Sequence, residues 1–227
     1  MKRDPLIETP ASPPSSVRAL LKDRAYDELK ALIQDGVFAP NTFLSERQLV
    51  ERLGMSKTPI RSALELLESQ GLVTVSPQQG IVVKDLSAQE VSDLFDMRSA
   101  VEPFIASHLA RRTLGTSPIA RLQTNLALQA EAARAGDAGA STRFDIEFHT
   151  LLAEILENRE AISWLYRCFD KLHRSILRIN RLSPGRLARS HEDHCAIASA
   201  ITSGHAEDAS RLMLNHLCYG RRFLQGG

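Results

Sequence analysis

The sequence has few cysteines and no long apolar runs, the features that are typical of secreted and membrane proteins. Its three cysteines, Cys168, Cys195 and Cys218, are an odd number without paired spacing, so a disulfide framework is not expected. No apolar run approaches the length of a membrane span, and no apolar core of a signal peptide follows the first residues. These absences favour a cytoplasmic protein that does not enter a membrane.

The sequence also lacks an excess of basic charge. Its formal net charge is +1 at pH 7, and basic and acidic side chains are equal in number between residues 17 and 86. The whole-chain charge therefore neither indicates nor excludes nucleic-acid binding. What counts is local placement, and Arg47, Arg52, Lys57 and Arg61 crowd one short segment.

The composition divides the chain into three parts. Residues 1–16 are rich in Pro, Ser and Thr, which predicts a disordered tail. Residues 17–84 combine helical spacing with short β-branched runs, whereas residues 85–227 are helical in period throughout. We therefore expect a mainly α protein in which a small N-terminal domain precedes an antiparallel all-α bundle of six or seven helices.

Residues 45–83 have the pattern of a helix, a tight turn, a second helix and a two-stranded wing. Ser45 and Gln48 have the spacing of a capping box. Gly54 ends the first apolar run, and Pro59 suits the first turn of the next helix. The runs LVTV and IVV flank a turn that contains Pro and Gly, which predicts a β-hairpin.

Two short tandem helices suit major-groove reading when small polar and basic residues begin the second. The first residues of that helix meet base edges, while hydroxyls and cations hold phosphates. The alternative is an ordinary three-element core with a solvated charged face. The predicted wing favours the DNA-binding interpretation.

The segment SERQLVERLGMSKTPIRSALELLESQGLV, followed by PQQG, resembles the winged helix-turn-helix of the GntR family of bacterial transcriptional regulators. The resemblance implies DNA contacts from five polar side chains and from a glycine at the wing: Arg47, Ser56, Lys57, Thr58, Arg61 and Gly80. Lys57 stands where the family usually has Arg, which keeps the charge but loses bidentate guanine contact. Asn41 stands where a Gly usually precedes the first helix of the motif.

The second part of the chain contains six predicted helices, at about 88–113, 118–134, 141–157, 160–180, 186–202 and 206–224. Ser87 and Glu90 form another capping-box pattern before the first of them. Pro103 lies inside that first helix, and we expect it to kink or divide the helix.

Three of these helices direct a histidine toward the apolar stripe. Asp145 and His149 lie on the stripe of one helix, His194 on that of another and His216 on that of the last. A single histidine in such a position is more often a hydrogen-bonded core residue. A buried carboxylate needs a partner, however, and one carboxylate with three imidazoles suits Zn²⁺ or another first-row divalent ion.

The D-x-x-x-H pair, together with His194 and His216 in their local contexts, resembles the FCD effector domain of the FadR branch of the GntR family. The resemblance implies that Asp145, His149, His194 and His216 bind a divalent metal, with Zn the expected ion and Ni or Mn as alternatives. It also implies that a small carboxylate effector reaches this metal inside the bundle.

Two further residues are candidates for effector binding. Arg98 lies on the inward stripe of its helix, where a guanidinium suits a bidentate hold on a carboxylate. The alternative for Arg98 is an ion pair with Glu102, four residues later. His173 shares an inward stripe with Phe169, and both ligand contact and plain packing remain open for it.

Together these observations predict a homodimeric repressor that binds palindromic operator DNA and responds to a small organic acid. One alternative keeps the regulator but makes the metal structural or the sensed signal itself. Another is a metal-dependent enzyme fused to a DNA-binding domain. Only Glu147 and Glu192 lie near the ligands as possible general bases, so no catalytic residues are predicted.

Overall fold

The computed structural model describes residues 15–76 and 80–224, and side chains from Leu20 onward. Two compact units are present. One contains the chain up to Ile33 and Phe38–Lys84, and the other contains Gln34–Val37 and the chain from Asp85. The predicted tail lies almost wholly outside the described residues, as does the hairpin tip at 77–79.

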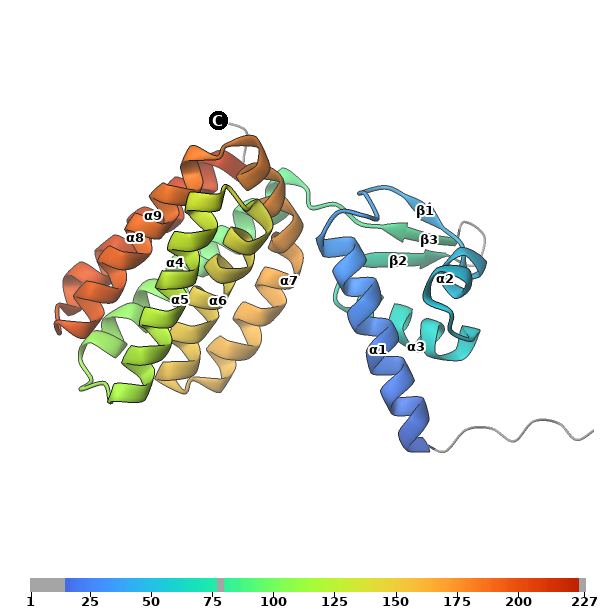
Figure 1. Ribbon diagram of the computed structural model, residues 1–227, viewed down its shortest axis with the longest axis horizontal. Helices are drawn as coiled ribbons and strands as arrows, with labels where there is room; N and C mark the ends of the chain where they lie inside the picture. Colours follow the sequence, from blue (N-terminus) through green and yellow to red (C-terminus); the bar gives the residue numbers. More distant parts are fainter. Residues whose placement is uncertain (1–14, 77–79, 225–227) are drawn as a thin grey trace, which may run out of the picture. The chain divides into compact units, whose positions relative to one another are not determined.

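The first unit is a winged helix-turn-helix (Figure 1). Its elements are α1 (Ser15–Gln34), β1 (Phe43–Leu44), α2 (Glu46–Leu53), α3 (Lys57–Ser69), β2 (Val73–Ser76) and β3 (Gly80–Val83). The sheet is antiparallel in the order β1-β3-β2, with Phe43 opposite Val82 and Val75 opposite Ile81. The sequence does not predict β1, because two residues are too few to show an alternating pattern.

Local signals determine where α2 begins and ends. The predicted capping box is confirmed, since the Gln48 N–H donates to Ser45 Oγ and the Ser45 N–H donates to Gln48 Oε1. Gly54 ends α2 in a left-handed conformation, with φ of 63°. Buried side chains of the three helices and the sheet form one apolar core, which includes Ala25, Leu29, Leu49, Ile60, Leu64, Leu67, Ile81 and Val83. This core holds α3 so that its first residues remain exposed.

The second unit is an antiparallel helical bundle (Figure 1). Its elements in the described chain are α4 (Ala88–Ala110), α5 (Thr116–Ala135), α6 (Ala138–Leu156), α7 (Arg159–Leu182), α8 (Gly185–Thr202) and α9 (Ala206–Leu224). Helix α4 packs mainly along α9, α6 packs between α5 and α7, and α8 contacts both α9 and α5. The predicted fold class is therefore confirmed, with six helices in the bundle.

Pro103 does not divide its helix, because α4 continues unbroken from Ala88 to Ala110. That half of the expectation is wrong, and a kink at Pro103 stays a prediction. A proline inside a helix removes one backbone hydrogen bond and costs about 3 kcal/mol or more. Phe95 and Ile105, on either side of Pro103, are almost fully buried in the bundle core. Burying large apolar side chains contributes about 1.5–3 kcal/mol each, so packing on both sides outweighs the local penalty.

The bundle core is mostly apolar, but polar and charged side chains are also buried in it. Buried polar or charged residues include Arg98 and Glu102 of α4, Asp145 and His149 of α6, His194 of α8 and His216 of α9. No helix of the described ranges is long and apolar enough to cross a membrane. These polar side chains thus lie inside a bundle whose core is otherwise mostly hydrocarbon.

Candidate metal centre and DNA-binding surface

Four predicted ligand residues from three helices meet inside the bundle. One potential ligand atom each from Asp145, His149, His194 and His216 lies within 4.8 Å of the others. The Nε2 atoms of His194 and His216 are 3.2 Å apart, and Asp145 Oδ1 is 3.7 Å from His194 Nε2. The three imidazoles are between 0 and 6% exposed, so bulk water does not solvate them.

Each imidazole directs its other nitrogen at an oxygen outside the cluster. His194 Nδ1 lies 2.8 Å from Gln129 Oε1, and His216 Nδ1 lies 3.4 Å from Asp193 Oδ2. The Gln129 amide nitrogen donates to Asn125 Oδ1, which leaves the Gln129 oxygen to accept from His194. Carboxylate or amide oxygens in this position fix the tautomer and orientation of metal-binding histidines.

The third imidazole has a carboxylate partner that the sequence did not single out. His149 Nδ1 lies 2.5 Å from Glu102 Oε2, and Glu102 Oε1 accepts a hydrogen bond from Arg98 Nε. Burial raises the pKa of Glu102, but Arg98 and His149 lower it more strongly, to about 2. Glu102 is therefore a buried carboxylate anion between a guanidinium and an imidazole.

Arg98 fits both interpretations that the sequence left open. Its Nε atom makes the predicted pair with Glu102, while its buried Nη2 has no hydrogen-bond partner in the described chain. The guanidinium also lies 5.0 Å and 4.6 Å from the ring centroids of Phe95 and Phe169. Stacking of this kind holds a buried cation in place and leaves donors at its edge.

Which nitrogens of the cluster accept hydrogen bonds depends on the tautomers of the histidines. With the ring protons on Nδ1, the lone pair of each Nε2 atom faces inward. Burial, together with the neighbouring imidazoles, lowers the pKa of His194 well below its usual value, and burial also lowers the pKa of His216. Protonation of these two imidazoles is therefore unfavourable.

A divalent ion fits this donor set. The buried His149 Nε2 has no hydrogen-bond partner within the described residues. Two nitrogens bound to one Zn²⁺ at about 2.0–2.1 Å in tetrahedral geometry are roughly 3.3 Å apart, close to the separation between His194 and His216. One carboxylate and three neutral imidazoles are also a ligand set that Zn²⁺ and other first-row divalent ions accept.

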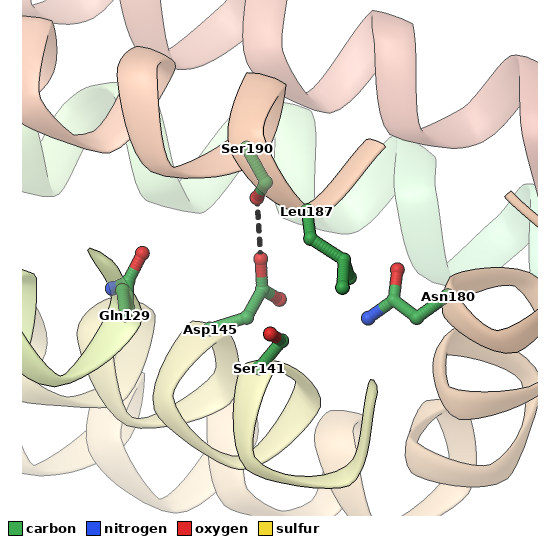
Figure 2. A pocket seen from close by; sticks show the side chains of 6 residues that line it. All are labelled: Gln129, Ser141, Asp145, Asn180, Leu187 and Ser190. Atoms are coloured by element: carbon green, nitrogen blue, oxygen red, sulfur yellow. Dashed lines mark hydrogen bonds between the residues drawn. The ribbon is translucent and has the colours of Figure 1, made fainter. Parts of the chain in front are cut away.

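A small pocket, partly open to solvent, borders the cluster at Asp145. Its lining residues come from α5, α6, α7 and α8 and are mostly polar: Gln129, Ser141, Asp145, Asn180, Leu187 and Ser190. Figure 2 shows Leu187 and Asn180 pointing across the pocket toward Asp145 and Ser141, and Ser190 donating a hydrogen bond of 2.8 Å to Asp145. His173 is half-buried on α7 and does not line this pocket.

The residues predicted to contact DNA lie around the start of α3 and on α2. Arg47, Ser56, Lys57, Thr58 and Arg61 are all exposed. Ser56 precedes α3 and makes no side-chain capping hydrogen bond, so its hydroxyl is not engaged with the helix end.

Two of these residues already have acidic partners. Arg61 donates to both carboxylate oxygens of Glu46, at 2.7 and 2.9 Å, and Arg47 Nε lies 2.8 Å from Glu51. Both pairs are at the surface, where an ion pair contributes little and is screened by salt. A phosphate or base edge can therefore compete for either guanidinium.

Gly80 has a structural reason to be glycine. Its φ is 81°, and a Cβ at this position would lie 2.8 Å from the Leu44 carbonyl oxygen. Asn41, which departs from the family pattern, also has a positive φ, of 61°. Asn tolerates the left-handed conformation better than most residues, which explains how it replaces the Gly that is usual there.

The winged helix-turn-helix and the helical bundle with its buried His/Asp cluster define a two-domain DNA-binding regulator. Residues 21–83 match the bacterial regulatory proteins of the gntR family, and residues 93–218 match the FCD domain. The chain therefore belongs to the GntR family of transcriptional regulators, in the group that carries an FCD domain, and this is consistent with the FadR-like subfamily.

Relatives that match most of the chain are also transcriptional regulators. An uncharacterized HTH-type transcriptional regulator, YdhC of Bacillus subtilis, is 27% identical over 192 residues, covering 84% of this chain and 85% of the relative. The HTH-type transcriptional repressor RspR of Escherichia coli is 28% identical over 217 residues, covering 93% and 90%. These proteins are transcriptional regulators, so the enzyme alternative has no support among them.

The fold is also found in solved structures. Escherichia coli McbR/YncC superposes with a TM-score of 0.79 at 20% identity, covering 90% of this chain and 96% of that one. At this identity the likeness concerns the fold alone.

Proposed function

We propose that the protein is a dimeric repressor that releases its operator when a small carboxylate binds at a divalent metal in the FCD domain. Asp145, His149, His194 and His216 would hold the metal, with Zn²⁺ the favoured ion and Ni²⁺ or Mn²⁺ alternatives. When bound, the ion supplies a Lewis-acidic point that attracts a carboxylate oxygen. Arg98, with a buried donor still available, would hold the same carboxylate.

The observation that carries this proposal is the convergence of buried acceptor atoms. Two Nε2 atoms at 3.2 Å, a third without a partner and the Asp145 carboxylate share one small volume. With the ring protons on Nδ1, a bound cation would offset the repulsion between these atoms. An interpretation as ordinary core histidines leaves at least His149 Nε2 without a hydrogen bond, which is costly when buried.

The DNA-binding part of the proposal rests on the exposed start of α3. In a dimer, two copies of α3 would enter successive major grooves of a palindromic operator. Lys57 and Arg61 would contact DNA directly, and Arg61 would exchange Glu46 for a base edge or a phosphate. The name of the relative RspR, a repressor, favours repression over activation.

Effector control requires unequal binding. The carboxylate must bind the DNA-incompetent arrangement of the dimer more tightly than the DNA-competent arrangement. His173, which lies outside the lining of the pocket, would then act on the effector only if it moves toward the pocket on binding.

The first test is the metal content of the purified protein. We expect about one divalent ion per chain in the wild type by elemental mass spectrometry, and loss of the ion in His149→Ala/His194→Ala/His216→Ala. His205→Ala is the matched control, because His205 is an exposed histidine at the turn before α9 and outside the cluster. A wild type that takes up no Zn²⁺, Ni²⁺ or Mn²⁺ would refute the metal-centred mechanism.

The same samples separate an effector-binding metal from a structural one. The cluster joins α6, α8 and α9, so an ion there also cross-links the bundle. If chelation unfolds the bundle, as followed by circular dichroism, the metal is structural. If chelation leaves the fold intact and by itself releases operator DNA, the metal is the sensed signal and not a receptor for an acid.

A further inference from the structure

From Arg167 to the end of α7, the outer side of the helix is basic. Asp170 is the one acidic residue between Arg167 and Leu182. The buried side chains of α7 lie on the opposite side and face the bundle core. Five cations are spaced four, three, four and three residues apart, which places them on one side of the helix: Arg167, Lys171, Arg174, Arg178 and Arg181. We call these five residues the α7 basic face.

Such a row of like charges is unfavourable for the folded chain by itself. Like charges three or four residues apart on a helix repel one another and destabilise it. Burial lowers the pKa of Arg174, and the charge of Arg178 adds to this effect, while Asp85 opposes it. Within the described residues, no ion pair involves Lys171, Arg178 or Arg181, and the two arginines are exposed. A partner with negative charges would relieve this repulsion.

The other bundle helices of the described chain do not share this excess of positive charge. Helix α7 carries six Arg or Lys and two Asp or Glu, whereas α4 carries one and four, and α6 one and three. Helices α5, α8 and α9 are close to balance. Because the whole chain has a net charge of only +1, the positive charge is concentrated on one face. A concentrated positive face attracts polyanions.

We propose that the α7 basic face is a second DNA-contacting surface, which holds backbone phosphates of the duplex that the winged helix-turn-helix binds. This inference goes beyond the proposed function and depends on neither the metal nor an effector. Duplex DNA is the polyanion that a GntR-family regulator already binds, and Lys and Arg neutralise its phosphates. From Arg167 to Arg181 the helix rises about 21 Å, which is the length of about six base pairs of duplex.

The α7 basic face includes a contact with the residue at which the chain enters the bundle unit. Arg174 Nη2 lies 3.3 Å from Asp85 Oδ1, and Asp85 belongs to the bundle unit. The winged unit ends at Lys84, so no linker separates it from the residue that Arg174 contacts. When one unit has bound a duplex, contact by the other is intramolecular, and even weak phosphate contacts then add to the affinity.

Contacts from the α7 basic face should strengthen binding without reading sequence. Phosphate contacts fix the position of a protein on the duplex, whereas contacts with base edges supply specificity. The choice of operator would stay with the start of α3. Loss of the α7 contacts should therefore weaken binding to any duplex by a similar factor.

The experiment measures DNA binding by the full-length protein as the salt concentration is varied. Lys171→Gln/Arg178→Gln/Arg181→Gln removes three cations of the α7 basic face and keeps good helix formers at all three positions. Arg111→Gln/Arg134→Gln/Arg222→Gln is the matched control, because it removes the same charge from exposed positions elsewhere in the bundle unit. Fluorescence anisotropy is recorded with two probes: an operator duplex selected from a random pool by the wild type, and an unrelated duplex of equal length.

We expect the α7 variant to bind both duplexes at least about tenfold more weakly than the wild type near 100 mM salt. The slope of log K against log salt should become shallower by about 0.9 for each phosphate contact that is lost. The control variant should stay within about threefold of the wild type. Ethylation of the phosphates that α7 contacts should weaken binding of the wild type and leave binding of the α7 variant unchanged.

Three results would overturn the proposal. Equal losses in the α7 variant and the control would show an effect of net charge alone. Wild-type affinity and salt slope in the α7 variant would remove α7 from the DNA surface. Normal DNA binding by the α7 variant, together with loss of wild-type binding to vesicles of phosphatidylserine and phosphatidylcholine, would assign the face to a membrane surface. The single variants R178Q and R181Q change exposed residues, so each should fold and lose part of the affinity even if the triple variant unfolds.

Discussion

Glu102 offers a quantitative test of how the candidate site is built. Its carboxylate lies between Arg98 Nε and His149 Nδ1, at 2.5 Å from each, and its side chain is 2% exposed. Glu102→Gln keeps the shape and an oxygen that can accept from His149, but it removes the negative charge. The buried Arg98 guanidinium then loses the carboxylate with which it is paired.

The expected loss is that of a broken buried ion pair. Removing one partner of a buried ion pair typically destabilises a protein by about 3–5 kcal/mol. The pKa of Glu102 is lowered from 4.5 to about 2, which corresponds to about 3 kcal/mol in favour of the folded, ionised state. A depressed carboxyl pKa stabilises the fold above its unfolded-state value and loses that contribution as pH falls toward 2, so the contribution is complete at pH 7.

Urea unfolding at pH 7, followed through the single Trp164 of α7, reports on the bundle specifically. We expect metal-free E102Q to lose about 3–5 kcal/mol, and the exposed control Glu131→Gln to stay within about 0.5 kcal/mol of the wild type. The double variant Arg98→Met/Glu102→Gln should recover most of the loss, because it removes both charges. If E102Q loses less than about 1 kcal/mol, the carboxylate does not compensate Arg98 as described.

Three further predictions concern other parts of the chain. Gly80→Ala should destabilise the wing by at least about 1 kcal/mol and weaken operator binding, because Gly80 has a positive φ and a close Leu44 carbonyl oxygen; an unchanged thermal transition would contradict this. Arg61→Gln should cost about 1–3 kcal/mol of operator affinity in an anisotropy titration, and wild-type affinity would remove Arg61 from the DNA surface. At pH 8, iodoacetamide should modify the exposed Cys218 and spare Cys168, whose pKa burial raises to about 12; similar labelling of both in peptide mass spectra would show that the core opens readily.

The sequence predicted those features that depend on spacing within one element. The capping boxes at Ser45 and Ser87 are confirmed because a cap involves residues only three positions apart. The convergence of the four ligand candidates was foreseeable because each lies on the buried stripe of its own helix. Strand β1 could not be predicted, since its only signal is its pairing with β3, which lies far away in the sequence.

The groups that orient the three histidines were harder to predict. Gln129 and Asp193 resemble ordinary polar residues of amphipathic helices, and only the packing of α5 against α8, and of α8 against α9, reveals their roles. Sequence spacing alone does not say which helices become neighbours, so it gives no reason to select these two residues.

Glu102 differs, because the pattern already contained the signal. It lies four residues after Arg98 and on the same inward stripe. The sequence left two alternatives for Arg98: an ion pair with Glu102, or contact with the effector. On an exposed face, an ion pair between Arg98 and Glu102 would indicate no further role for Arg98, since surface pairs contribute little and need no further partner. On a buried face the pair engages only Arg98 Nε and leaves Nη2 without an acceptor. Because a buried donor without a partner is costly, the ion pair does not compete with ligand binding but leaves a donor in place for it.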